Sequence, residues 1–121
     1  MDDTKLGVVE ARFADLIWAH EPIGSRALAE LCEKELRWKR PTTYTVLRKL
    51  CEKGIFQNAD GTVSSLLSRD EFYARRSERY LAETYGGSLP AFIAAFTARN
   101  KLTDEEADAI QKLIDDARRE G

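Results

Sequence analysis

A basic, hydroxyl-rich stretch at residues 37–55, RWKRPTTYTVLRKLCEKGI, carries the side chains best suited to contact DNA. Within residues 37–53 there is a single acid, Glu52, against the basic residues Arg37, Lys39, Arg40, Arg48, Lys49 and Lys53. Cations neutralise phosphates, and hydroxyl and guanidinium groups hydrogen-bond to base edges in the major groove. The stretch therefore predicts a nucleic-acid interface, although the net charge of the whole chain is −2.

The spacing of apolar residues predicts that residues 41–53 form a helix with two different sides. One stripe of a helical wheel holds Thr43, Val46, Leu47 and Leu50. The other side displays hydroxyls, an aromatic ring and cations, so it is typical of a recognition helix; Thr42, Tyr44, Thr45 and Arg48 are expected to face the groove. The full set of predicted DNA contacts is Arg37, Lys39, Arg40, Thr42, Tyr44, Thr45, Arg48, Lys49 and Lys53.

The segments around this helix predict a winged helix-turn-helix module over residues 1–67. Apolar spacing indicates a helix over about 6–19, then a loop over 20–25, then a second helix with Ser25 as its N-cap. Gly54 suits the position just after the end of the third helix. Two β-prone runs flank Asp60-Gly61, which is a strong signal for a hairpin turn. The expected fold is mainly α with a small β-hairpin.

Residues 68–121 predict three short amphipathic helices that form a dimerisation region. Capping signals place their starts near Ser68, Ser88 and Thr103. Their apolar stripes have little to bury against within one chain, so we expect a dimer bundle, although the helices could instead cap the DNA-binding module. The residues expected at the dimer interface are Tyr80, Leu81, Phe92, Phe96, Ile110, Leu113 and Ile114.

Composition and motifs argue against several other classes of protein. Charged residues interrupt every hydrophobic run, and the N-terminus lacks the order of a signal peptide, so we expect a cytoplasmic protein without membrane insertion. Cys32 and Cys51 lack C-x-x-C spacing and predict two half-buried thiols, with a metal pair or a redox sensor as the alternatives. His20 has no evident orienting acid, so no enzyme, cofactor or metal site is predicted.

Three segments together resemble the penicillinase-repressor family, the BlaI/MecI-type winged-helix regulators. EARFADLIW, residues 10–18, looks like the opening helix of the family. Residues 37–55 resemble its recognition segment, with Trp, a polar turn, Thr-x-x-Thr and a closing Lys-Gly. YGGSLPAFIAAFTARNKLTDEEADAIQKLI, residues 85–114, is similar to its C-terminal signature. The match in register across nearly the whole chain is specific.

The resemblance implies a homodimeric transcriptional repressor that binds a palindromic operator in double-stranded DNA. In characterised relatives a membrane-bound sensor metallopeptidase responds to β-lactam, and the repressor is cut in its C-terminal domain. The resemblance places Ala95–Phe96 at the bond that is Asn-Phe in cleaved relatives, so cleavage and release by a ligand or modification both stay open. The CopY-type branch uses a cysteine-rich tail, and the tail DDARREG has no cysteine.

One departure from the family keeps a second function in view. The expected hairpin tip, NADGT at residues 58–62, lacks the lysines that relatives often carry there. Together with the acidic net charge, this favours, as an alternative, a winged-helix dimerisation partner that no longer binds an operator.

Overall fold

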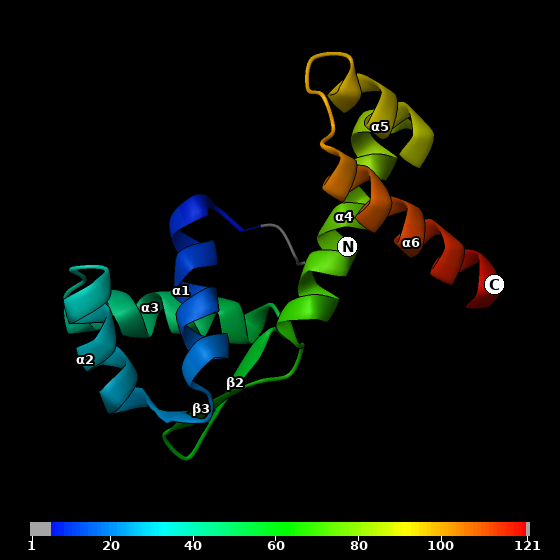
Figure 1. Cartoon of the computed structure of the whole chain (residues 1–121). Helices are drawn as coiled ribbons and strands as arrows, with labels where there is room; N and C mark the ends of the chain where they lie inside the picture. Colours follow the sequence, from blue (N-terminus) through cyan, green and yellow to red (C-terminus); the bar gives the residue numbers. More distant parts are fainter. Residues whose placement is uncertain (1–5, 121) are drawn as a thin grey trace. The chain divides into compact units, whose positions relative to one another are not determined.

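The structure is a computed structural model that describes residues 6–120, and it is mainly helical with one small sheet (Figure 1). Its elements are, in order, α1 (Val8–His20), β1 (Ile23–Gly24), α2 (Ser25–Glu35), α3 (Arg40–Glu52), β2 (Phe56–Ala59), β3 (Thr62–Ser65), α4 (Arg69–Tyr85), α5 (Leu89–Thr97) and α6 (Asp104–Glu120). Helices, then a β-hairpin, then more helices confirm the predicted fold class, a winged helix-turn-helix followed by a helical C-terminal region.

The three strands form an antiparallel sheet in the order β1-β3-β2. Asp60 and Gly61 join β2 to β3 with φ angles of 52° and 85°, as a type I′ hairpin turn requires. The hairpin predicted from these two residues is confirmed. The expectation that residues 20–25 form only a loop is wrong, because β1 lies within them and pairs with β3. A strand of two residues is too short to leave an alternating pattern in the sequence.

The ends of the helices follow the predicted signals with small shifts. Gly24, rather than Ser25, is the N-cap of α2, because the extended backbone of β1 runs through Gly24 and Ser25 is already helical. Gly54 follows the C-cap residue Lys53 with a φ of 80°, which is the left-handed conformation that favours glycine after a helix. The predicted end of the recognition helix is therefore confirmed.

One hydrophobic core holds α3 against the rest of the winged-helix module. Its fully buried side chains include Phe13 and Ile17 of α1, Leu28 of α2, Leu50 of α3, Phe56 of β2, Val63 of β3 and Phe72 of α4. Burial of a side chain of this size contributes about 1.5–3 kcal/mol relative to leaving it exposed. The core thus fixes the buried side of α3 and leaves the other side free for a partner.

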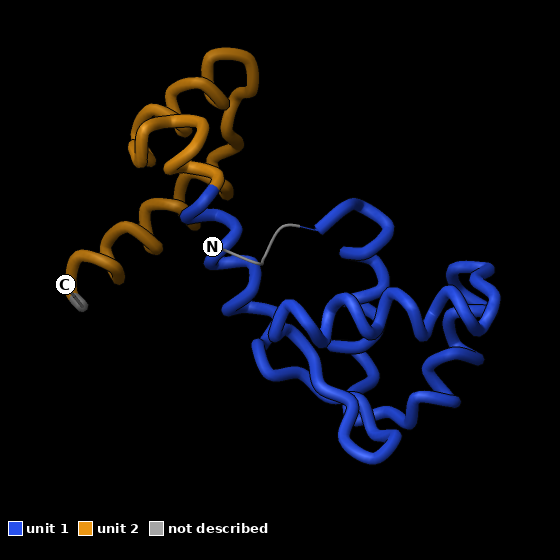
Figure 2. The backbone as a smooth tube through the Cα atoms, turned by 180° about the vertical axis from the view of Figure 1, so that it is seen from behind, with its two compact units in different colours: residues 1–79 blue, residues 80–121 orange. Residues whose placement is uncertain are grey.

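The chain divides into two compact units, residues 1–79 and residues 80–121 (Figure 2). The division lies inside α4, because the first turns of this helix carry Phe72 into the core of the first unit. A functional boundary after Leu67, expected from the sequence, stays a prediction.

The second unit has capped helices but little interior of its own. Ser88 caps α5 by accepting a 3.1 Å hydrogen bond from the amide of Ala91. Thr103 and Glu106 form the predicted capping box, with bonds of 2.9 and 3.0 Å, and the backbone and hydroxyl of Thr103 lower the pKa of Glu106. Between residues 80 and 119 the structure describes no fully buried side chain. Contacts within this unit therefore leave most of its apolar surface uncovered.

Candidate nucleic-acid interface

Helix α3 carries the predicted interface, and its buried side is the predicted one. Lys39 is the N-cap, and Pro41 lies in the first turn, where a missing amide hydrogen costs little. Thr43, Leu47 and Leu50 are buried. The helical wheel drawn from the sequence is therefore confirmed for the side of α3 that faces the core.

The opposite side of α3 displays the residues expected to contact DNA. Their side chains are exposed at Arg37, Lys39, Arg40, Thr42, Tyr44, Thr45, Arg48 and Lys49, and half-buried at Lys53. Arg37 precedes the helix and has a φ of 58°. Lys53 is the C-cap residue, so it lies at the far end of the helix from this group. The structure thus places the hydroxyls, the aromatic ring and most of the cations along one exposed helix.

Arg40 and Thr45 of this set have partners within the chain. The guanidinium of Arg40 donates to Glu33 of α2 at 3.0 Å and lies 3.7 Å from Glu30. The hydroxyl of Thr45 donates to the carbonyl oxygen of Pro41 at 2.9 Å, which leaves its lone pairs and methyl group for a partner. The pairs of Arg40 join α2 to α3, and nothing in the spacing of the sequence predicts them.

Five residues of the set are uncommitted. The side chains of Arg37, Lys39, Tyr44, Arg48 and Lys49 form no hydrogen bond or ion pair with the described residues. Exposed cations of this kind gain little from weak pairs with other surface groups, but they neutralise a phosphate backbone effectively. The exposed side of α3 is therefore available for an anionic partner.

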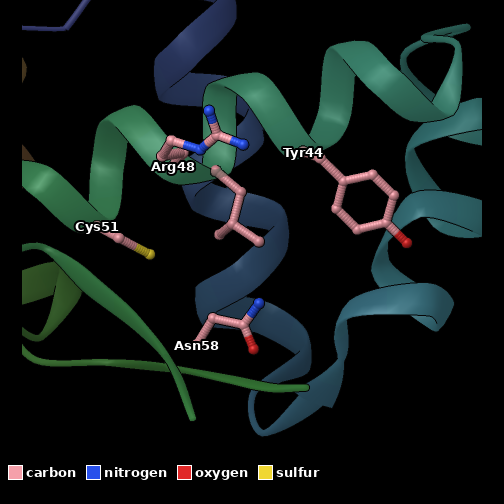
Figure 3. Close-up of a pocket in the computed structure, with 5 residues that line it drawn as sticks. Tyr44, Arg48, Cys51 and Asn58 are labelled. Carbon is pink, nitrogen blue, oxygen red and sulfur yellow. The ribbon is translucent and has the colours of Figure 1, made fainter. Parts of the chain in front are cut away.

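A hollow of about 300 Å³ lies between α3 and the hairpin and is lined by Tyr44, Leu47, Arg48, Cys51 and Asn58 (Figure 3). Asn58 belongs to β2, and the other four residues belong to α3. Burial, together with the neighbouring carboxylate of Glu52, raises the pKa of the Cys51 thiol. Sequence reasoning missed Asn58, although its position two residues after the buried Phe56 places both on one face of β2.

The second thiol, Cys32, is fully buried in the core between α2 and α3. Burial raises its pKa, and the neighbouring hydroxyl of Thr43 partly opposes that shift. Thr43 is itself buried, and its hydroxyl has no hydrogen bond of normal geometry within the described residues. Cys32 thus behaves as a packing residue, while Cys51 is half-buried at the hollow.

The histidine and the possible metal ligands considered in the sequence do not form a grouped site within the described residues. His20 is the last residue of α1, not part of a loop as expected, and its Nδ1 lies 2.9 Å from the carbonyl oxygen of Leu16. Across residues 6–120 no three or more His, Cys, Asp or Glu side chains are grouped to hold a metal. Within that same range none of the helices has the length and hydropathy to cross a membrane.

The residues expected at the dimer interface lie in the second unit. Tyr80, Phe96, Leu113 and Ile114 are exposed by 51%, 48%, 68% and 46%. Leu81, Phe92 and Ile110 are half-buried. Tyr80, Tyr85 and Phe92 form an aromatic cluster with ring centroids 5.6 to 6.2 Å apart, which joins α4 to α5.

The bond expected for cleavage, Ala95–Phe96, lies inside α5, and both side chains are exposed. The carbonyl oxygen of Phe96 accepts a 3.0 Å hydrogen bond from the side chain of Asn100. A protease binds its substrate as an extended strand, so this helical bond must open before it can be cut.

The chain matches the penicillinase repressor family over residues 6–116. It is similar to the penicillinase repressor of Bacillus licheniformis, with 22% identity over 111 residues that cover 88% of this chain and 87% of that protein. The match includes both the winged-helix module and the C-terminal helices, and it confirms the resemblance found in the sequence. The chain therefore belongs to the penicillinase repressor family, a family of DNA-binding transcriptional repressors.

Proposed function

We propose that this protein represses transcription as a homodimer that binds a palindromic operator through α3 of each subunit. The observation that carries the proposal is the uncommitted polar side of α3, where Arg48, Lys49 and Tyr44 have no partner within the described chain. Such a surface suits a phosphate backbone and the base edges beside it.

Within this surface the residues divide by chemistry into two roles. Thr42 and Thr45 carry hydroxyl and methyl groups, which can contact base edges and the thymine methyl group. Arg37, Lys39, Lys49 and Lys53 are suited to phosphates, which position the helix without reading sequence. Arg40 has to exchange its α2 partners for a phosphate if it contributes, so its net effect on affinity is expected to be smaller.

Homodimerisation is supported by the exposed apolar residues of the second unit. Leu113 and Ile114 of α6 and Phe96 of α5 remain exposed in the single chain. Exposed apolar groups of this size are typical of an interaction surface. A two-fold axis through paired C-terminal helices would relate two recognition helices, and a palindromic operator matches that symmetry.

We further propose that the protein acts in the cytoplasm and that proteolysis of α5 relieves repression. The partner would be a membrane-bound sensor metallopeptidase, and the cut would fall at Ala95–Phe96. Exposure of both side chains supports access once the helix opens. Release by a bound ligand or by modification is the competing route.

A second candidate function is a dimerisation partner without its own operator. It is favoured by the hairpin turn, where Asp60 supplies a negative charge next to Gly61 and no cation is present in residues 58–62. Selection of duplexes from a random pool with the full-length protein separates the two functions. A two-fold symmetric sequence, bound with an affinity that falls steeply with salt, supports the repressor. Failure to enrich any sequence supports the partner protein.

A further inference from the structure

The hollow between α3 and β2 combines an apolar floor with a rim of hydrogen-bond donors. Leu47 is only 3% exposed and belongs to the helix side of the hollow. The guanidinium of Arg48, the ring of Tyr44 and the amide of Asn58 line the hollow, and the hydroxyl of Tyr44 points away from the other two (Figure 3). Neither the guanidinium of Arg48 nor the amide of Asn58 has a hydrogen bond within the described residues. The hollow therefore offers unused donors beside a small apolar surface.

These donors suit an anionic oxygen group attached to an apolar unit. A guanidinium binds phosphate oxygens through two parallel hydrogen bonds, and an amide adds a further donor. The carbon atoms of a deoxyribose can rest on Leu47. Glu52 is the only acid in α3, and its side chain is exposed.

We propose that the hollow receives one deoxyribose-phosphate of the operator backbone, and that Arg48 and Asn58 hold its phosphate. This proposal rests on the function proposed above. It adds Asn58 as a contact that fixes the distance between the DNA backbone and the hairpin formed by β2 and β3. Arg48 then contacts the DNA backbone, whereas its place on the helical wheel predicted that it reads bases. Tyr44 closes the hollow on the side nearer the start of α3.

The strand, rather than the tip of the hairpin, supplies this contact. Asn58 pairs with Val63 in the sheet and shares a face of β2 with the buried Phe56. Its neighbour Gln57 points to the other face and donates to the hydroxyl of Ser64 at 3.2 Å. A hairpin without lysines at its tip can thus still engage the DNA backbone.

The first test measures DNA binding by single variants of the full-length protein. The probe is the duplex enriched from a random pool with the wild-type protein, beside a random duplex of equal length. Asn58→Ala is expected to weaken both complexes about tenfold, the usual effect of losing a hydrogen bond to a charged group. Gln57→Ala, the matched amide on the opposite face, is expected to leave both affinities within about twofold of wild type, because its partner is Ser64 rather than DNA.

The second test locates the phosphate. Methylphosphonate is placed at each backbone position of the enriched duplex in turn. One position per half-site is expected to weaken the wild-type complex, and the same substitution should have little further effect on Asn58→Ala or Arg48→Ala. Loss of that additivity identifies the shared contact. If the loss of affinity from methylphosphonate at every position multiplies with the loss from Asn58→Ala, Asn58 contacts none of these phosphates and the proposal is overturned.

The third test needs no substitution, because Cys51 lines the hollow. The rate at which Cys51 reacts with a thiol reagent is measured with saturating enriched duplex, and separately with inorganic phosphate at constant ionic strength. The duplex is expected to slow the reaction at least about tenfold, since a bound backbone unit covers the thiol. Protection by inorganic phosphate but none by the duplex would assign the hollow to a free anion, and an unchanged rate in both would overturn the proposal.

The proposed function and this inference fail in different ways. If the wild-type protein enriches no duplex, the repressor function itself fails. If a duplex is bound with steep salt dependence and Lys49→Ala weakens it, while Asn58→Ala and the reactivity of Cys51 are unaffected, only the occupant of the hollow is wrong.

Discussion

The indole nitrogen of Trp18 donates a 3.0 Å hydrogen bond to the carbonyl oxygen of Leu67, at the end of the hairpin segment. The ring of Trp18 also lies 5.1 Å from that of Phe56 and 5.3 Å from that of Phe72. This one side chain therefore joins α1 to β2 and to the start of α4. It holds the wing and the first turns of α4 in place beside the recognition helix.

Replacement of Trp18 by phenylalanine is expected to lower the free energy of unfolding by about 1–3 kcal/mol. The change leaves the Leu67 carbonyl without its donor and removes part of the ring contact. Urea unfolding followed by circular dichroism measures the loss. Trp38→Phe is the matched control, because Trp38 packs against Phe13 at 5.1 Å and forms no indole hydrogen bond within the described residues, so its effect should be smaller. Equal losses in the two variants would contradict the role given to the hydrogen bond.

Two variants of α3, Thr45→Ala and Lys49→Ala, are expected to distinguish a residue that reads bases from one that binds the phosphate backbone. Removal of the Thr45 hydroxyl and methyl groups should cost about 1–3 kcal/mol on the preferred duplex and relax its base preference at one position. Removal of Lys49 should weaken preferred and random duplexes alike and reduce the salt slope by about 1. Affinities across a salt series and a panel of single-base variants measure both effects. A uniform loss on all duplexes for Thr45→Ala would remove it from the base-reading residues.

The local parts of this architecture could be predicted from the sequence. The hairpin follows from Asp60-Gly61, and the end of α3 follows from Gly54, because each depends on the conformations open to one or two residues. The buried stripe of α3 follows from helical periodicity. Strand β1 could not be predicted, because its only reason to be extended is the pairing with β3, a contact made about forty residues later in the chain.

The candidate site shows the same division. The exposed face of α3 could be drawn from spacing alone. The ion pairs of Arg40 with Glu33 and Glu30 depend on how α2 packs beside α3. The place of Asn58 at the same hollow as Arg48 depends on how the hairpin folds back. Neither arrangement leaves a periodic signal in the sequence, because each depends on tertiary packing and not on local spacing.

Dimerisation is expected to depend on the exposed apolar residues of α6. Leu113→Gln removes the most exposed of them, at 68%, and should shift the protein from dimer toward monomer at micromolar concentration. Lys112→Gln places the same side chain at the adjacent exposed position and should leave the dimer intact. Sedimentation equilibrium measures both variants. A monomeric wild-type protein would contradict the proposed assembly.

A fragment that ends after Arg79 tests the same assembly from the other direction. It keeps Phe72 in the core of the first unit, whereas a fragment that ends near Ser68 would lose that side chain. We expect residues 1–79 to fold and to sediment as a monomer. A stable dimer of this fragment would place the main interface in the winged-helix module.

Alkaline pH is expected to weaken the fold through Cys32. Burial raises the pKa of this thiol in the folded chain above its ordinary value of 9.0. The contribution of the neutral thiol to stability is therefore fully present below about pH 9 and is lost as the pH rises toward the folded pKa, because the unfolded chain ionises first. The free energy of unfolding is measured in urea with reductant between about pH 7.5 and about pH 10.5. The difference between wild type and Cys32→Ala should become smaller as the pH rises. A constant difference across that range would contradict ionisation of Cys32 on unfolding.

Cleavage at Ala95–Phe96 requires α5 to open locally, because the bond lies inside this helix. The hydroxyl of Ser88 accepts a 3.1 Å hydrogen bond from Ala91 and caps this helix, and loss of such a cap costs about 1 kcal/mol. Ser88→Ala should therefore raise the population of the open helix, and with it the cleavage rate, about fivefold when opening is in fast equilibrium.

Thermolysin is a suitable probe, because it cuts on the amino side of large apolar residues and so recognises Phe96. Ser68→Ala is the matched control: its hydroxyl accepts an equal 3.1 Å bond, from Glu71, but it caps α4 in the first unit. Both variants lose one serine cap, and only Ser88→Ala should accelerate the cut between Ala95 and Phe96, as mass spectrometry of the fragments would show. Equal acceleration by both would mean that the cut follows global unfolding, and the idea that local opening of α5 controls release would have to be given up.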